Sequence, residues 1–223
     1  REKIALFADV DVRAVISNHD VKTIYEVPLV LESEGLGGFI AERFGVNDVE
    51  PDLTEWREMV AALHRPMQKI EIGIVGKYIE LADSYLSVIE SIRLAGIEQN
   101  VDPVIRWINA ETLEDRDPSD LLDGVAGIIV PGGFGPRGIE GKVQAANFAR
   151  VNNIPYLGLC LGMQIAVIEF ARKALGVDDC NSTEFDPDTK HPVVHPMQEY
   201  YDVANMGGSM RLGLWPCELV SST

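Results

Sequence analysis

The chain has 223 residues, of which 46% are apolar, and it carries 19 Lys and Arg against 35 Asp and Glu, a formal charge of −16. This length and apolar content allow one large domain, or one domain and part of another, with a real core. The negative charge argues against nucleic acid and anionic membranes as partners, so any nucleotide must bind in a local pocket.

The sequence favours a cytoplasmic protein with reduced thiols. No apolar run approaches the roughly 18 residues that a membrane span needs, and the N-terminus has no signal-peptide pattern. The three cysteines, Cys160, Cys180 and Cys217, are odd in number, widely spaced and without a CxxC pair. Neither a disulfide framework nor a zinc site is indicated, and we expect no metal site within this chain.

The first 44 residues form the first predicted segment. Residues 3–7 (Lys-Ile-Ala-Leu-Phe) and 14–17 (Ala-Val-Ile-Ser) favour strands. Residues 27–44 predict two short helices that are broken near the glycines at 35–38. The chain opens without a start signal and ends on a strand-like run at 217–223, which suggests that it is cut from a larger protein.

Residues 45–69 are acidic and polar, and we interpret them as a linker with one helix. Pro51 and Pro66 enclose that helix, which is predicted to begin near Thr54 and carries apolar residues on one face. The linker would join residues 1–44 to a domain at 70–223. A surface helix of one continuous domain is the alternative.

From residue 70 onward, strands and helices alternate. Strands are predicted at 70–76, 104–108, 125–130 and 156–159, and helices at 84–99, 142–152 and 161–174. This pattern predicts an α/β fold whose mainly parallel sheet is covered by helices on both faces. In such sheets the chemistry gathers at the carboxyl ends of the strands.

The most informative stretch is Gly-Leu-Cys-Leu-Gly-Met-Gln at residues 158–164, where a buried strand is predicted to become a helix. Cys160 would occupy the sharp turn, hereafter the elbow, and small neighbours let strand and helix pack closely. The helix N-terminus would favour the thiolate and would offer free N–H groups to an oxyanion. The elbow alone leaves two readings open, a nucleophile or a buried structural thiol.

A glycine-rich turn follows the preceding strand, with the sequence Val-Pro-Gly-Gly-Phe-Gly at residues 130–135. Both this turn and the elbow should fall at the carboxyl edge of the sheet. An N–H of the glycine turn could then supply a second oxyanion donor opposite that of Leu161. One such turn is weak evidence, but its pairing with the elbow favours the nucleophile.

Several short motifs resemble those of class I glutamine amidotransferases and, more narrowly, the CTP synthase family. They are Gly-Lys-Tyr-Ile-Glu-Leu at 76–81, Pro-Gly-Gly-Phe-Gly at 131–135, Cys-Leu-Gly-Met-Gln at 160–164, Asn-Ser-Thr-Glu-Phe at 181–185 and Gly-Gly-Ser-Met-Arg-Leu-Gly at 207–213. Residues 3–7 and 19–28 resemble the end of the amidoligase domain of that family, which is of the P-loop type. The resemblance covers nearly the whole chain.

The resemblance implies a glutaminase site in residues 70–223. Cys160 would attack the side-chain amide of glutamine, and the N–H groups of Gly133 and Leu161 would form the oxyanion hole. Glu184 would pair with the α-ammonium group of glutamine, although a carboxylate in a polar stretch is by itself more often a solvated loop residue. The remaining glutamine-binding residues would be Gly162, Met163 and Gln164.

The resemblance also shows what this sequence lacks. In the family, a His-Pro-Glu motif supplies the general base and the carboxylate that orients it, and it lies well after the motif at 207–213. His191 and His195 precede that motif, so we interpret them as loop histidines. We therefore expect the chain to be truncated before its base and inactive alone. A catalytically silent regulatory or scaffold module is the alternative, and another α/β cysteine hydrolase would fit the elbow but not residues 181–185.

For the whole protein, the resemblance implies glutamine-dependent amination of UTP to CTP with ATP hydrolysis. ATP and Mg²⁺ would bind in an amidoligase part that precedes residue 1, GTP would activate and CTP would inhibit, and the protein would be a homotetramer. In this chain Lys3 would lie near the UTP or CTP phosphates, and His19, Asp20 and Val21 near the ATP base. A lysine near a terminus is otherwise usually just solvated.

Overall fold

The computed structural model describes residues 1–46, 50–65, 67–77, 79 and 82–195. The chain divides into two compact units, one of residues 1–69 with 91–102 and one of residues 70–90 with 103–223. Helix α5 (Leu86–Glu98) and strand β2 (Val101–Asn109) cross the boundary between them. Among the described residues, every helix is too short or too polar to cross a bilayer.

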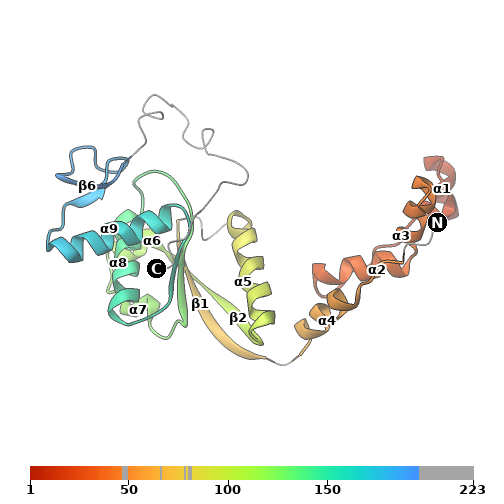
Figure 1. The fold of residues 1–223 in the computed structure, drawn as a ribbon, viewed down its shortest axis with the longest axis horizontal. Helices are drawn as coiled ribbons and strands as arrows, with labels where there is room; N and C mark the ends of the chain where they lie inside the picture. Colours follow the sequence, from red (N-terminus) through yellow and green to blue (C-terminus); the bar gives the residue numbers. More distant parts are fainter. Residues whose placement is uncertain (47–49, 66, 78, 80–81, 196–223) are drawn as a thin grey trace. The chain divides into compact units, whose positions relative to one another are not determined.

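The first unit is built mainly from short helices, shown in red and orange in Figure 1. In chain order these are α1 (Glu2–Ala8), η1 (Val12–Ala14), η2 (Ile24–Glu26), α2 (Val27–Ser33), α3 (Leu36–Phe44) and α4 (Thr54–Leu63). The predicted break between two short helices is confirmed, because Gly35 separates α2 from α3 with a φ of 86°. Helix α4 begins at Thr54, as the linker sequence predicts.

The two strands predicted at 3–7 and 14–17 are wrong. Residues 3–7 lie in α1, whose C-cap, Asp9, has a φ of 52°. A short apolar run has no distinct period, and its Ala, Leu and Lys are good helix formers. Residues 12–14 form a 3-10 turn that Asp11 caps by accepting a hydrogen bond from the N–H of Arg13. The strand predicted at 217–223 lies outside the described residues.

Helix α4 is fixed to η2 by three contacts within the first unit. The indole Nε1 of Trp56 donates to the carbonyl of Tyr25 at 2.7 Å, and the two rings lie 6.2 Å apart. At the end of the helix, His64 Nε2 lies 2.7 Å from Glu26 Oε1. These contacts attach the helix of the predicted linker to the segment that precedes it.

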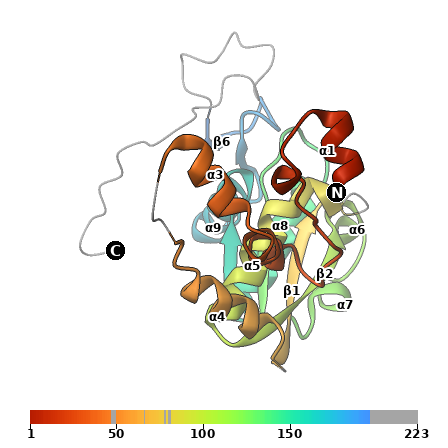
Figure 2. The same cartoon turned by 90° about the vertical axis from the view of Figure 1, so that its right-hand side faces the viewer.

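The second unit contains the predicted α/β sheet. Its strands have the order β2-β1-β3-β4, formed by β1 (Gln68–Gly76), β3 (Gly127–Val130) and β4 (Tyr156–Gly158) beside β2. Strands β1, β3 and β4 are parallel, with Ile74 paired to Ile129 and Val130 paired to Gly158. Figures 1 and 2 both show β1 and β2 side by side. The α/β fold class is confirmed.

The helices of this unit follow the predicted alternation. Helix α5, with the 3-10 turn η3 (Ala82–Tyr85) before it, α8 (Ile139–Val151) and α9 (Leu161–Leu175) match the three predicted helices within a few residues. Two short helices, α6 (Ala110–Glu114) and α7 (Ser119–Leu122), were not predicted. They are too short for a hydrophobic period to identify them. A separate pair of short parallel strands, β5 (Cys180–Ser182) and β6 (His191–Val194), follows α9.

Two clusters of buried side chains hold the second unit together. The first lies between the sheet and helices α6, α7 and α8, and includes Leu113, Ile128 and Val130. The second joins α8 to α9 through Val143, Ile165 and other apolar residues. Tyr156 packs against both clusters. The elbow at the start of α9 therefore rests on a continuous apolar interior.

Candidate active site

The chain turns sharply at Cys160, between β4 and α9, as predicted. Cys160 has a φ of 53° and a ψ of −106°, a conformation that non-glycine residues rarely adopt. It is the N-cap of α9 and is exposed, whereas Cys180 is fully buried. Cys160 is therefore not the buried structural thiol of the alternative reading.

Two glycines make the elbow possible because no side chain would fit at either position. A methyl group on Gly158 would lie 2.3 Å from the carbonyl carbon of Gly162. A methyl group on Gly162 would lie 2.0 Å from the carbonyl oxygen of Val130 on β3. The start of α9 thus packs directly on the backbone of two strands, which limits where Cys160 can lie.

The glycine-rich turn faces the elbow. A methyl group on Gly132 would lie 3.5 Å from the Cβ of Cys160, and one on Gly133 would lie 3.5 Å from the Cδ2 of Leu161. The N–H of Leu159 donates to the carbonyl of Val130 at 2.9 Å, which ties the two strand ends together. The first N–H groups of a helix have no partner within it, so Leu161 can offer its N–H to a ligand.

Glu184 reaches the same turn from the segment after β5. Its Oε1 accepts a hydrogen bond from the N–H of Gly135 at 3.2 Å, and its own N–H donates to the Oγ of Ser182 at 3.2 Å. The carboxylate is half-buried. Met163, 56% exposed, and Gln164 lie on the first turn of α9. The elbow and Glu184 thus both lie against the glycine turn.

Two residues that support the site were not assigned a role from sequence. The ammonium group of Lys77 donates to the carbonyl of Phe134 in the glycine turn. The hydroxyl of Tyr156 donates to the carbonyl of Gly162 at 2.8 Å. Lys77 lies in the motif at 76–81 and Phe134 in the motif at 131–135, and this membership is the sequence signal that could have identified Lys77. Tyr156 gave no signal beyond its position in an apolar strand.

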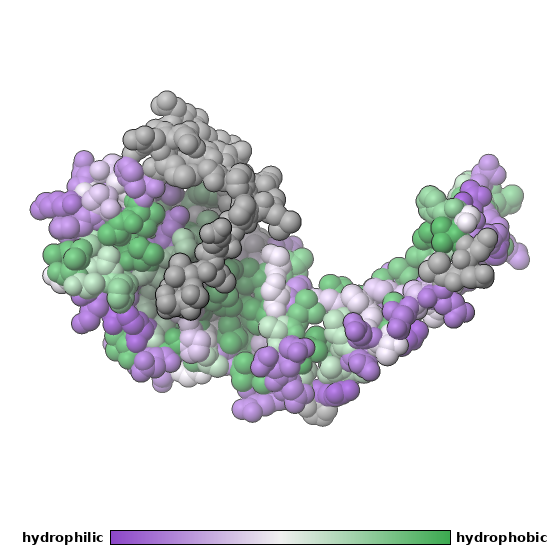
Figure 3. All heavy atoms as spheres, in the orientation of Figure 1, coloured by the Kyte–Doolittle hydropathy of each residue, from purple (hydrophilic) through white to green (hydrophobic). Residues whose placement is uncertain are grey.

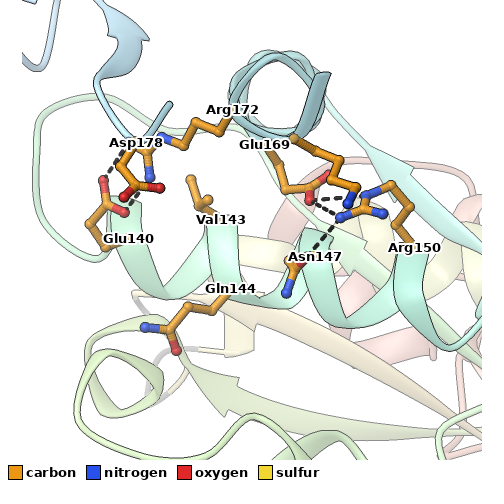
Figure 4. Close-up of a pocket in the computed structure, with 9 residues that line it drawn as sticks. Glu140, Val143, Gln144, Asn147, Arg150, Glu169, Arg172 and Asp178 are labelled. Carbon is orange, nitrogen blue, oxygen red and sulfur yellow. Dashed lines mark hydrogen bonds and ion pairs between the residues drawn. The ribbon is translucent and has the colours of Figure 1, made fainter. Parts of the chain in front are cut away.

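A groove of about 310 Å³ lies between α8 and α9 (Figure 4). Its charged side chains pair across the two helices, Arg150 of α8 with Glu169 of α9, and Arg172 of α9 with Glu140 of α8. Each arginine donates two hydrogen bonds to its partner carboxylate through two guanidinium nitrogens. These pairs flank the second apolar cluster and hold the elbow helix on its neighbour.

The histidines near the site bond to other residues. His191 Nδ1 lies 2.8 Å from Asp179 Oδ1, and His195 Nδ1 lies 2.7 Å from Thr183 Oγ1. The motif at 207–213 falls outside the described residues. Within the part of the chain that the structure describes, no group of three or more His, Cys, Asp or Glu is arranged to hold a metal ion.

The nucleotide candidates all lie in the first unit. Asp20 and Val21 line a pocket of about 530 Å³ together with Lys22, Glu26 and His64. Lys3 lies on α1 and His19 in the irregular segment before that pocket, and both are exposed. The structure therefore brings two of the four candidates into one pocket. Nucleotide binding by all four residues stays a prediction.

Comparison with known proteins identifies the family. Residues 80–223 match the model of the class I glutamine amidotransferases, and residues 1–46 match that of the CTP synthase N-terminus. The chain therefore belongs to the class I glutamine amidotransferase family, and within it the chain resembles CTP synthases. A CTP synthase of Chloroflexus aurantiacus is 58% identical over all 223 residues, and one of a Roseiflexus species is 55% identical over 224 residues.

These relatives are longer than this chain, which spans 41% and 40% of their lengths. A solved structure also matches, the glutaminase domain of Trypanosoma brucei CTP synthase with bound acivicin. It is 44% identical, with a TM-score of 0.53, and the match covers 58% of this chain and 50% of that one.

Proposed function

We propose that residues 70–223 contribute the glutamine-hydrolysing site of a CTP synthase, with Cys160 as its nucleophile. The observation that carries the proposal is the strained, exposed Cys160 at the N-terminus of α9, opposite the glycine turn. A matched relative of this domain was solved with acivicin, which is a glutamine analogue. We expect the same class of ligand here.

The proposed reaction begins when the Sγ of Cys160 bonds to the side-chain carbonyl carbon of glutamine. The carbonyl oxygen becomes an oxyanion, which the N–H groups of Gly133 and Leu161 would hold. Collapse of this intermediate breaks the C–N bond, releases ammonia and leaves a thioester. Water then cleaves the thioester to give glutamate and the free thiol.

Substrate binding would use the same surface. The carboxylate of Glu184 would pair with the α-ammonium group of glutamine, since a small zwitterion needs a fixed anion at that end. Gly162, Met163 and Gln164 would line the pocket along the first turn of α9. The hydrogen bond from Gly135 to Glu184 would keep the carboxylate beside the oxyanion turn.

The general base is the part that this chain does not supply. A thiol nucleophile needs a group that removes its proton and later protonates ammonia. His191 and His195 pair with Asp179 and Thr183, and neither belongs to a His-Pro-Glu sequence like the one that supplies the base in the family. We therefore expect the 223 residues alone to hydrolyse glutamine at a negligible rate.

In the complete protein, the ammonia would aminate UTP. The proposed overall reaction is UTP, ATP, glutamine and water giving CTP, ADP, phosphate and glutamate. ATP and Mg²⁺ would bind outside this chain, except that His19, Asp20 and Val21 would lie near the ATP base. Lys3 would lie near the UTP or CTP phosphates. GTP activation, a homotetramer and a cytoplasmic location complete the proposal.

The test is covalent labelling of the complete natural polypeptide with a glutamine-analogue diazoketone. We expect one label, on Cys160, and loss of glutamine-dependent but not ammonia-dependent CTP synthesis. Excess glutamine should protect the thiol. An unlabelled Cys160 in a protein that still makes CTP from ammonia would contradict the proposal and favour a catalytically silent module.

A further inference from the structure

One tyrosine bridges the two elements that meet at the nucleophile. Tyr156 is the first residue of β4, and its hydroxyl donates to the carbonyl of Gly162 in the first turn of α9, at 2.8 Å. Cys160 lies between these two residues in the chain. A single side chain therefore links the strand before the elbow to the helix after it.

The carbonyl that Tyr156 holds lies in the most crowded part of the elbow. A methyl group added to Gly162 would lie 2.0 Å from the carbonyl oxygen of Val130, and one added to Gly158 would lie 2.3 Å from the carbonyl carbon of Gly162. Gly162 follows Leu161, whose N–H is a proposed oxyanion donor. One peptide unit separates the peptide that carries the Gly162 carbonyl from the peptide that carries the Leu161 N–H, so a shift of the carbonyl would move that N–H through the first turn of α9.

The tyrosine itself is firmly held. Its ring packs against both apolar clusters, so it has little freedom to turn. Burial, and to a lesser degree the charge of Glu169, raises the pKa of the Tyr156 phenol above its ordinary value. The hydroxyl therefore stays protonated and remains a donor at any pH at which the enzyme would work. Glu169 is fixed in turn by the guanidinium of Arg150 (Figure 4).

We infer that Tyr156 is a positioning residue for the nucleophile elbow: its hydroxyl fixes the Gly162 carbonyl and thereby aligns the Leu161 N–H with the oxyanion. The inference rests on the proposed function. It assigns no contact between Tyr156 and glutamine. Its effect should appear in the chemical step, where charge develops on the oxygen, and not in substrate binding.

The test is Tyr156→Phe in the complete natural polypeptide, because it removes the hydroxyl and keeps the partly buried ring. Loss of an oxyanion donor costs about 10²- to 10³-fold in kcat, so a misaligned donor should cost about 10-fold. We expect kcat for glutamine hydrolysis to fall by about that factor, with KM within about 2-fold. Ammonia-dependent synthesis should be unchanged.

Two thiol reagents separate positioning from a general structural defect. A glutamine-analogue diazoketone depends on the oxyanion donors, so its rate of reaction with Cys160 should fall along with kcat. Iodoacetamide does not use those donors, and its rate at Cys160 should stay the same. Ser33→Ala is the control, since it removes a hydroxyl-to-carbonyl hydrogen bond of 2.7 Å in the first unit and should change neither rate.

The outcomes are distinguishable. Unchanged kcat in Tyr156→Phe, in an enzyme whose wild type hydrolyses glutamine, overturns this inference and leaves the proposed function standing. A parallel loss of both labelling rates, or a rise in KM without a fall in kcat, also overturns it. Failure of the proposed function is seen in the wild type itself, as absence of glutamine hydrolysis and of diazoketone labelling.

Discussion

The two units of the chain are stabilised in different ways. Among the described residues, the buried hydrophobic side chains of residues 1–69 are only Ala5 and Val60, whereas the second unit has two apolar clusters. On α1, Leu6 and Phe7 are 78% and 80% exposed, and Figure 3 shows hydrophobic residues at the surface of the N-terminal helices. The strained elbow belongs to the unit with the core.

Polar contacts hold much of the first unit together. Arg13 pairs with Glu42 at 2.7 Å and with Asp11 at 2.9 Å, and these neighbours raise the pKa of the Arg13 guanidinium. All three side chains are 40% or more exposed, so solvent screens their attraction. A strained turn needs surroundings that cannot relax, and exposed pairs do not provide them.

The largest effect is expected at Cys160, the proposed nucleophile. Cys160→Ala in the complete natural polypeptide should lower glutamine hydrolysis by about 10³-fold or more, because no thioester can form. Ammonia-dependent activity should persist, since it bypasses the thiol. Cys180→Ala, at the buried cysteine, is the control and should retain glutamine hydrolysis. Steady-state assays with glutamine and with ammonia measure the two activities. Glutamine hydrolysis that survives in Cys160→Ala would show that Cys160 is not the nucleophile.

The next prediction compares the same substitution in the two units. Ile165 is fully buried on α9, and Ile4 is 61% exposed on α1. Ile165→Ala should lower the free energy of unfolding by about 2–5 kcal/mol, because it leaves a cavity. Ile4→Ala should change it by less than about 0.5 kcal/mol. Urea unfolding of both variants gives the difference, and equal losses would show that our comparison of the two units is wrong.

The same contrast explains what the sequence could predict of the fold. In the second unit, hydrophobic periodicity and burial agree, so the strands and long helices were found within a few residues. In the first unit, apolar residues such as Leu6 and Phe7 do not face a core, so their order in the sequence carries no reliable period. That is why a strand was predicted where α1 forms.

The site was predictable where backbone geometry restricts the residue type. Gly158 and Gly162 are required by close packing, so a pattern of glycines around Cys160 indicated the turn. At Gly132 and Gly133 an added methyl group would make only ordinary contacts of 3.5 Å, so packing does not require glycine there. The Tyr156 hydroxyl was not predictable, because many apolar residues fit a half-buried strand position. Only the fold brings its oxygen to the carbonyl of Gly162.

A smaller effect is expected at Lys142, which is buried on α8 with only 2% of its surface exposed. Burial, and to a lesser degree the charge of Lys77, lowers the pKa of Lys142 to about 8, and Glu114 opposes this. Because this pKa lies below that of the unfolded chain, the folded state binds fewer protons between about pH 8 and pH 10.5. Stability should therefore rise with pH through this window.

Lys142→Met removes this titration while keeping most of the volume. Below pH 8 the variant should be more stable than the wild type by about 1–3 kcal/mol, and the difference should vanish as the pH approaches about 10.5. Lys173→Met, at an exposed lysine of α9, is the matched control and should show no such pH dependence. Urea unfolding at pH 7, 8.5 and 10 measures it, and a constant difference would contradict the linkage.

The smallest effect is expected at the contact that fixes α4 in the first unit. Trp56→Phe keeps an aromatic ring beside Tyr25 but removes the N–H that donates to its carbonyl at 2.7 Å. One such hydrogen bond contributes about 1 kcal/mol, so amides of residues 54–63 should exchange about 5-fold faster. Amides of α9 should be unaffected, because the elbow helix depends on its own core. Faster amide exchange in α9 would mean that the stability of α9 depends on contacts in the first unit. It would contradict the view that the two units are stabilised separately.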